Sequence, residues 1–91
     1  MSKVFAWDEE KNIKLIKERG VSFEAVVSCL EEGNLFAIAA GKGKFSHQQQ
    51  YLIVINDYVY IVPFAEEEKR IFLKTIIPSR KMTKRYLFGG D

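Results

Sequence analysis

The sequence predicts an α+β fold in one small domain, with an N-terminal strand and a two-helix hairpin packed on an antiparallel β-meander and followed by a short C-terminal helix. Three observations lead to this prediction. The chain has 91 residues of which 47% are apolar, helical periodicity is confined to the first third, and strand-like runs fill most of the remainder. A chain of this length buries a single core, so residues 1–91 are expected to form one domain.

The first elements are a short strand and a helix. The apolar run of residues 4–7 ends at Asp8, whose carboxylate suits the N-cap of a helix over residues 9–18. Gly20 follows as a left-handed C-terminal stop. A strand therefore leads directly into the first helix.

The second helix has the clearest periodicity in the chain. Ser22 is its predicted N-cap and Gly33 its stop. Apolar residues recur at i, i+3, i+4 and i+7, at Phe23, Val26, Val27 and Leu30. The two helices are expected to form a hairpin.

Beyond residue 34 the pattern becomes that of strands. Residues 35–40, 51–55 and 58–62 are rich in apolar, β-branched and aromatic side chains. The last two runs are separated only by Asn56-Asp57, which indicates a two-residue hairpin. Pro63 lacks a ladder donor, so we expect a sheet edge, a bulge or a strand end at that position.

The final strand is predicted over residues 70–77 and the terminal helix over residues 80–87, with Ser79 as its N-cap. Strict alternation predicts that Lys74 projects from a rigid strand. The two predicted faces are Ile71, Leu73, Thr75 and Ile77 on one side, and Arg70, Phe72, Lys74 and Ile76 on the other.

Positive charge is concentrated near the C-terminus. Residues 69–88 carry seven Lys or Arg and no acid, whereas residues 1–68 carry seven Lys or Arg against eleven Asp or Glu and sum to −4. The resulting field suits a polyanionic partner. The alternative is a solvated strand and tail whose cations maintain solubility.

Several function classes lack support in the sequence. No apolar run approaches the roughly 20 residues of a membrane span, and charge interrupts the first residues before a signal-peptide core, so we expect a cytoplasmic protein with no membrane partner. Cys29 is the single cysteine and falls on the apolar face of the second helix, so it is interpreted as a core or near-core residue. No Cys/His cluster, carboxylate pair or nucleophile–base set is evident, and we predict neither a metal site nor a cofactor.

Both ends of the chain resemble a known family. The blocks that carry the resemblance are Phe5-Ala6-Trp7-Asp8, Lys11, Gly20-Val21-Ser22-Phe23-Glu24 and Ile76-Ile77-Pro78-Ser79-Arg80-Lys81-Met82-Thr83-Lys84-Arg85-Tyr86. In this order and at these distances they are similar to the BrnT family of bacterial toxins. The resemblance implies the toxin half of a type II toxin–antitoxin pair, with a RelE-like ribonuclease fold. It also implies cleavage of RNA, inhibition of translation, and neutralisation by a cognate antitoxin that represses the operon.

The chain departs from the family pattern at three places. Glu18-Arg19 replaces the usual Lys-His pair, Gln48-Gln49-Gln50 replaces an arginine, and Thr75, with Lys74 beside it, replaces another. The chain is therefore interpreted as a divergent branch of the family or an attenuated enzyme. A catalytically inactive module of the same fold, which binds an antitoxin-like partner or nucleic acid, is the alternative function.

Metal-free RNA cleavage requires a base for the 2′-hydroxyl, cations for the crowded phosphorane and an acid for the leaving oxygen. The resemblance implies that Arg and Lys supply much of this chemistry, and Arg80 is the foremost candidate. The predicted catalytic residues are Arg80, Lys81, Lys74, Glu18 and Arg19. The predicted RNA-binding residues are Lys11, Lys84, Arg85 and Tyr86.

Each of these residues has a simpler interpretation. Arg80 and Lys81 suit an acidic antitoxin surface as well as RNA. Lys11 and Arg19 are of a type usually found as solvated helix residues, and Tyr86 suits packing against the sheet. His47, the only histidine, is either a stand-in base or a solvated loop residue. A structural homodimer joined through the strand at residues 58–62 is a further alternative.

Overall fold

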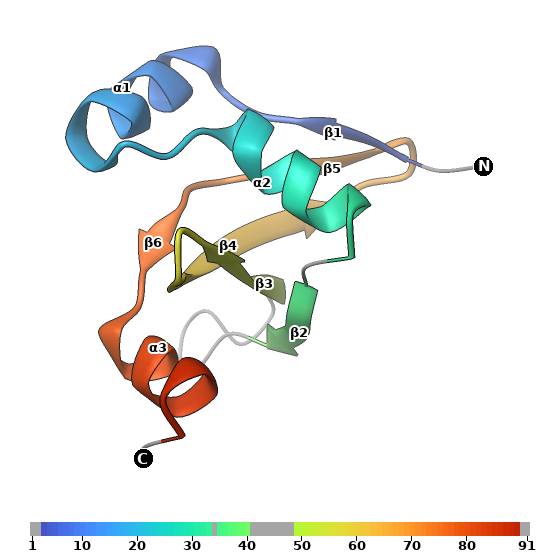
Figure 1. The fold of residues 1–91 in the computed structure, drawn as a ribbon. Coiled ribbons are helices and arrows are strands. Elements are labelled where there is room, and N and C mark those ends of the chain that lie inside the picture. The colour runs from blue at the N-terminus through green and yellow to red at the C-terminus, as the bar shows by residue number, and fades with distance from the viewer. Residues whose placement is uncertain (1–2, 34, 41–48, 90–91) are drawn as a thin grey trace.

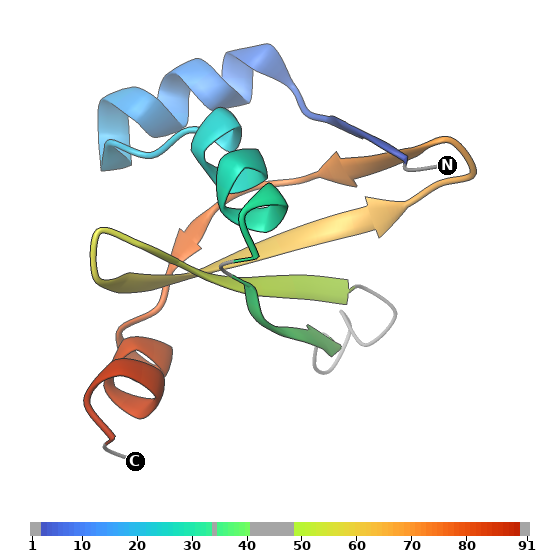
Figure 2. The ribbon, with the colours of Figure 1, turned by 45° about the vertical axis from the view of Figure 1, so that its right-hand side comes forward.

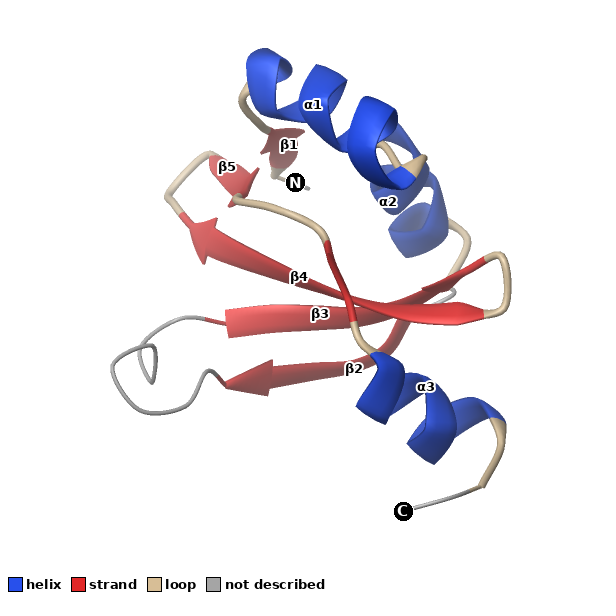
Figure 3. Cartoon of the chain, turned by 90° about the vertical axis from the view of Figure 1, so that its left-hand side faces the viewer, coloured by secondary structure: helices blue, strands red, loops and turns tan. Residues whose placement is uncertain are grey.

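The computed structural model of the chain describes residues 3–33, 35–40 and 49–89, and His47 lies outside this range. The elements in order are β1 (Val4–Ala6), α1 (Glu9–Arg19), α2 (Phe23–Glu31), β2 (Leu35–Ala40), β3 (Gln49–Ile55), β4 (Tyr58–Glu66), β5 (Arg70–Leu73), β6 (Ile77–Pro78) and α3 (Arg80–Leu87). Helices α1 and α2 lie over one face of the sheet and α3 lies on the opposite side (Figures 1 and 3). The predicted α+β class is confirmed, and so is the element order except that the predicted last strand is divided into β5 and β6.

The sheet is mixed. Strands β2 to β5 form the predicted antiparallel meander, and the strand order across the sheet is β1-β5-β4-β3-β2. The N-terminal strand β1 pairs in parallel with β5, with Phe5 opposite Ile71 (Figure 2). Strand β6 pairs with β4 off this path, with Ile77 opposite Ile61. The two ends of the chain are thereby joined through one central meander.

The predicted helix caps are present. Asp8 accepts a hydrogen bond of 2.9 Å from the N–H of Glu10, and Ser22 accepts one of 3.1 Å from the N–H of Ala25. Gly20 ends α1 with φ of 69°, a left-handed conformation in which an L side chain is strained. Local sequence chemistry therefore sets where α1 starts and stops and where α2 begins.

The β3–β4 connection is the predicted two-residue hairpin. Asn56 and Asp57 have φ of 53° and 61°. Positive φ at both central residues is the signature of the type I′ turn, whose twist matches that of the flanking strands. This tight turn fixes the register of β3 on β4, with Ile55 opposite Tyr58.

The core lies between the helix hairpin and the face of the sheet that α1 and α2 cover. Tyr51 stacks on Phe64 with ring centroids 4.0 Å apart, and Trp7 stacks on Phe23 at 5.7 Å. The buried residues of this cluster are Leu15, Val21, Phe23, Val26, Tyr51, Ile53, Val62, Phe64, Leu73 and Ile76. Residues from both helices and from three meander strands thus share one core.

The predicted continuous strand over residues 70–77 is wrong. Strand β5 ends at Leu73 and β6 begins at Ile77. Leu73 and Ile76 are both fully buried in the core, whereas Ile77 is 40% exposed. Strict alternation would place Leu73 and Ile76 on opposite faces, so the chain must leave the ladder between them to bury both. Lys74 therefore follows the strand instead of projecting from it.

Pro63 also differs from its prediction, because it lies inside β4 opposite Gln50 and the strand continues to Glu66. The Pro63 carbonyl accepts a hydrogen bond of 2.9 Å from the N–H of Lys74. The N–H that proline lacks would point to the same side, where the chain leaves the sheet between β5 and β6. The proline is tolerated because its nitrogen faces the gap between the β4–β5 pairs, which end at Phe64, and the β4–β6 pairs, which end at Ile61.

Candidate functional site

Helix α3 is anchored to the start of strand β4 through one residue, Val59. The N–H of Ser79 donates to the Val59 carbonyl at 2.9 Å. The N–H of Val59 donates to Thr83 Oγ1 at 2.8 Å, and that hydroxyl donates in turn to the Ser79 carbonyl at 2.7 Å. Thr83 is only 4% exposed, so this polar junction is buried and every hydrogen bond in it is made inside the protein.

Ser79 is the N-cap of α3, as predicted. Its Oγ accepts from the N–H of Met82 at 3.1 Å, and its carbonyl accepts from the N–H of Thr83 at 3.0 Å. Within the described part of the chain, the N–H groups of Arg80 and Lys81 have no partner. They point from the open end of the helix, where the macrodipole places partial positive charge.

Four cations occupy the exposed side of α3, which we call the α3 cation face: Arg80, Lys81, Lys84 and Arg85. Their helical spacing places them away from the buried Thr83. The ion pairs between described residues are Lys3 with Glu66 and Arg70 with Glu67, so no described carboxylate neutralises this face. The structure therefore brings four of the predicted site residues together.

Tyr86 lies on α3 beside this face. The residue is 42% exposed, so more than half of its surface is covered by the protein. It stands four residues after the half-buried Met82, which places both on the same side of the helix. Tyr86 therefore borders the cations and does not lie among them.

Arg19, at the end of α1, contacts the segment between β5 and β6 that also carries Lys74. The Nη1 atom of Arg19 donates to the backbone carbonyl of Ile76, between β5 and β6. Glu18 directly precedes Arg19 in α1, Lys74 follows β5, and both side chains are exposed. Figure 3 shows the end of α1, the segment joining β5 to β6, and α3 on the side of the molecule that faces the viewer.

The start of α3 and the segment that carries Lys74 are connected through β4. Val59 holds the start of α3 and Pro63 holds the backbone of Lys74. These positions are four residues apart, or about 13 Å along a strand. Lys11 is more distant, because it precedes Arg19 by two helical turns, about 12 Å along α1, and is half-buried.

Two residues that organise the site were not predicted. Asn12 is 1% exposed and joins the two helices, donating to Glu24 Oε1 at 2.7 Å and accepting from the N–H of Phe23 at 2.8 Å. The sequence offered one signal of this burial: Asn12 stands three residues before Leu15 and so lies on the same side of the helix. Thr83 is the other unpredicted residue. The sequence signal was that it follows the Ser79 cap by four residues, the spacing at which a Thr hydroxyl can donate to a backbone carbonyl.

Cys29 is half-buried against the core, as predicted. Burial, and to a lesser extent the nearby charge of Glu32, raise the pKa of its thiol. The Sγ atom lies 3.5 Å from the Val54 carbonyl, to which it donates. The thiol thus remains protonated at neutral pH, which makes it a poor nucleophile.

The described residues contain no group of three or more His, Cys, Asp or Glu side chains placed to hold a metal ion. No helix in the described ranges is long and apolar enough to cross a bilayer.

Comparison with known families identifies the chain. The family model described as "Ribonuclease toxin, BrnT, of type II toxin-antitoxin system" matches residues 7–85, which include both helices of the hairpin, the whole meander and most of α3. No curated protein and no solved structure matched. The match spans most of the sequence and agrees with the resemblance at its two ends, so the chain belongs to the BrnT family of ribonuclease toxins from type II toxin–antitoxin systems.

Proposed function

We propose that this protein is a metal-independent RNA endonuclease of RelE-like type that inhibits translation, is neutralised by a cognate antitoxin and uses the α3 cation face as its site. The observation that carries the proposal is the position of Arg80 and Lys81. Both stand exposed on the first turn of a capped helix, with no described carboxylate to neutralise them. Family membership supports RNA as the substrate.

The electrostatics of α3 favour an anionic ligand. A cation at a helix N-terminus opposes the macrodipole and typically costs about 0.3–1 kcal/mol. Here both Arg80 and Lys81 occupy that position, and the first turn contains no acid. A phosphate bound there meets two side-chain cations together with the N–H groups of the open helix end. The arrangement opposes helix stability and favours phosphate binding.

The proposed reaction is attack of the ribose 2′-oxygen on the adjacent phosphorus. The P–O5′ bond breaks, which leaves a 2′,3′-cyclic phosphate on one product and a 5′-hydroxyl on the other. Arg80 binds two non-bridging oxygens and stabilises the phosphorane through its planar guanidinium. Lys81 delivers a proton to the leaving 5′-oxygen, and a solvent water takes the 2′-hydroxyl proton. Glu18 lies on α1, over the opposite face of the sheet from α3, and we assign it no step in this reaction.

The remaining predicted residues are assigned supporting roles. Lys84, Arg85 and Lys74 extend the positive surface along the RNA backbone, and Tyr86 offers a partly exposed ring for a base. Arg19 acts as a positioning residue, because its guanidinium is bound to the Ile76 carbonyl and so fixes the segment that carries Lys74.

A binding module without turnover is the second candidate. The observation that favours it is the same Arg19 contact, because it commits part of that guanidinium to a backbone carbonyl and leaves fewer N–H donors for the phosphorane. In that case the α3 cation face holds RNA or an acidic antitoxin surface without cleaving either.

Induced expression in a bacterial host tests the proposal. Growth and the integrity of total RNA are followed for the wild type and for the double variant Arg80→Ala/Lys81→Ala. We expect the wild type to arrest growth and fragment RNA, and the double variant to do neither. Lys69→Ala is the matched control, since it removes an exposed cation of the same basic segment from the β4–β5 turn and leaves α3 intact.

Two results separate the candidates. If Lys69→Ala retains toxicity while the folded double variant loses it, the ribonuclease assignment stands. If the wild type leaves RNA intact both in cells and as purified protein, yet binds RNA, the chain is a binding module.

A further inference from the structure

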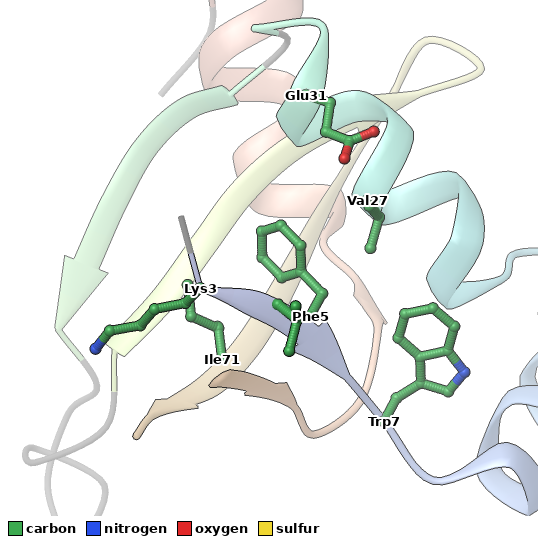
Figure 4. Close-up of a pocket in the computed structure, with 7 residues that line it drawn as sticks. Lys3, Phe5, Trp7, Val27, Glu31 and Ile71 are labelled. Carbon is green, nitrogen blue, oxygen red and sulfur yellow. The ribbon is translucent and has the colours of Figure 1, made fainter. Parts of the chain in front are cut away.

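An apolar pocket opens between β1 and α2, in the layer opposite α3. Its volume is about 560 Å³, and it is lined mainly by Phe5, Trp7, Val27 and Ile71. Figure 4 shows the ring of Phe5, on β1, and that of Trp7, in the segment just after β1, on the side of the strand that faces Val27 and Glu31 of α2. The RNA site proposed above makes no use of this pocket.

Strand β1 adds a row of hydrogen-bonding groups beside the pocket. It has β5 on one side and, in the described part of the chain, no strand on the other. The N–H of Val4 donates to the Lys69 carbonyl at 3.3 Å, so the backbone groups of Phe5, the next residue, point to the open edge. An open edge next to an apolar pocket is the geometry by which a sheet takes up an extended peptide.

The charge at the rim determines what kind of peptide fits. Lys3 Nζ forms an ion pair with Glu66 Oε2 at 3.0 Å. In Figure 4 the Lys3 side chain extends away from the rings of Phe5 and Trp7. Glu31 has no ion pair with any described residue, and α2 contains no Lys or Arg. Among the described residues, the charge at this pocket that has no ion pair is therefore the negative charge of Glu31, and a cation beside an apolar side chain complements it.

We propose that this groove binds an extended segment of the antitoxin, which pairs with β1, seats an apolar side chain on Phe5, Trp7 and Val27, and places a Lys or Arg against Glu31. That the partner is an antitoxin rests on the proposed function, whereas the chemistry of the segment follows from the groove. Because α3 lies on the other side of the sheet, the groove provides an attachment point separate from the RNA site (Figure 3).

The probe is a phage-displayed library of random linear peptides, selected on the immobilised full chain. Affinities of the selected peptides are then measured by fluorescence of Trp7, the single tryptophan, which lines the groove. We expect a consensus in which an apolar residue neighbours Lys or Arg. Val27→Glu should weaken binding by about tenfold or more. Ser28→Glu, which adds the same charge at an exposed neighbouring position, should leave it unchanged.

Glu31→Lys tests the charge without altering the apolar floor. Selection on this variant should replace Lys or Arg in the consensus by Asp or Glu, while Glu68→Lys, a matched change on the exposed β4–β5 turn, should leave the consensus as it is. Peptides that bind all variants equally, or acidic peptides whose binding depends on Lys84 and Arg85, would overturn the proposal.

Two further measurements keep the interpretation unambiguous. If sedimentation finds a wild-type dimer that Val27→Glu converts to a monomer, the groove belongs to a second copy and the proposal is wrong. RNA cleavage by Val27→Glu is assayed in parallel and should equal that of the wild type. If neither the wild type nor Val27→Glu cleaves RNA, the proposed function is refuted. The peptide-binding measurements then still decide whether the groove binds the predicted segment.

Discussion

Asn12 and Thr83 show how single buried polar residues position this site. Asn12 ties α1 to the start of α2, and Thr83 ties α3 to Val59 at the start of β4. In both cases the side chain satisfies a backbone N–H that would otherwise be buried without a partner, a loss that costs more than the bond itself contributes. These two residues hold the elements that carry Glu18, Arg19 and the α3 cation face.

Thr83→Val should lower the free energy of unfolding by about 1–3 kcal/mol, because it keeps the shape of the side chain and leaves the Val59 N–H without an acceptor. Thr83→Ser retains the hydroxyl and should recover most of this loss. Urea denaturation of the three proteins provides the measurement. Equal midpoints for wild type and Thr83→Val would contradict the assigned role.

Tyr51 should make the protein sensitive to alkaline pH. Burial, and secondarily the charge of Glu66, raise the pKa of its phenol above the ordinary value of 10.0. The folded state therefore keeps this proton at pH values where the unfolded chain releases it. The associated stability is complete below about pH 10 and is lost as the pH rises through the folded pKa.

Thermal denaturation at pH 8 to 11 measures this effect, with Tyr51→Phe as the comparison. We expect the melting temperature of the wild type to fall more steeply above pH 10 than that of Tyr51→Phe. The raised pKa of the Cys29 thiol acts in the same direction, so the comparison is best made in a Cys29→Ala background. Parallel curves for the two proteins would be inconsistent with a buried phenol.

At the scale of elements, the interruption between β5 and β6 is the feature that shapes the candidate site. It buries Leu73 and Ile76 together, releases Lys74 from the sheet and presents the Ile76 carbonyl to Arg19. A continuous strand would have kept that carbonyl in a ladder. The end of α1 and the start of α3 are brought to one side of the molecule by this short irregular segment.

Arg19→Ala should lower the stability by about 1.5–3 kcal/mol at most, the contribution typical of a hydrogen bond to a charged group. For a positioning residue, we expect a lower kcat for RNA cleavage with KM nearly unchanged. Arg19→Lys keeps the charge and should recover part of kcat. A rise in KM alone would instead indicate that Arg19 contacts RNA directly.

The helices and their caps were predictable because they are determined locally: Asp8, Gly20 and Ser22 act on residues within one turn. The β5–β6 interruption was not, because the burial of Ile76 depends on contacts far away in sequence. The prediction of an edge, a bulge or a strand end at Pro63 was wrong for the same reason. Whether the missing N–H matters depends on the neighbouring strand, which is distant in sequence. Among site residues, composition located the α3 cation face, but nothing local indicated that Arg19 would bind a carbonyl.

At the scale of the whole molecule, the layer that contains α3 is strongly positive, with four Lys or Arg and no acid on the helix. Helices α1 and α2, which cover one face of the sheet, carry five Glu against four Lys or Arg and are close to neutral together. The α3 cation face lies across the sheet from them. This distribution of charge orients a polyanion toward α3 and leaves the β1–α2 groove for a partner segment with the opposite charge preference.

RNA binding should weaken steeply with salt, because each phosphate contact releases condensed counterions. If the α3 cation face and Lys74 together contact five phosphates, the slope of log K against log salt is about −3.5 for a single strand. Lys84→Ala/Arg85→Ala should make the slope less negative by about 1.4. Fluorescence anisotropy with a labelled oligoribonucleotide gives both values, and a slope near zero would remove the electrostatic basis of the site.

The most direct test of the central claim is single-turnover cleavage of a labelled RNA by purified protein in buffer containing EDTA. We expect the wild type to produce 2′,3′-cyclic phosphate ends, and Arg80→Ala, folded as judged by circular dichroism, to be slower by about 10²–10³-fold, the loss typical when one group that stabilises transition-state charge is removed. Lys69→Ala should cleave at the wild-type rate. Equal rates for the wild type and Arg80→Ala would show that the chemistry takes place elsewhere than on α3.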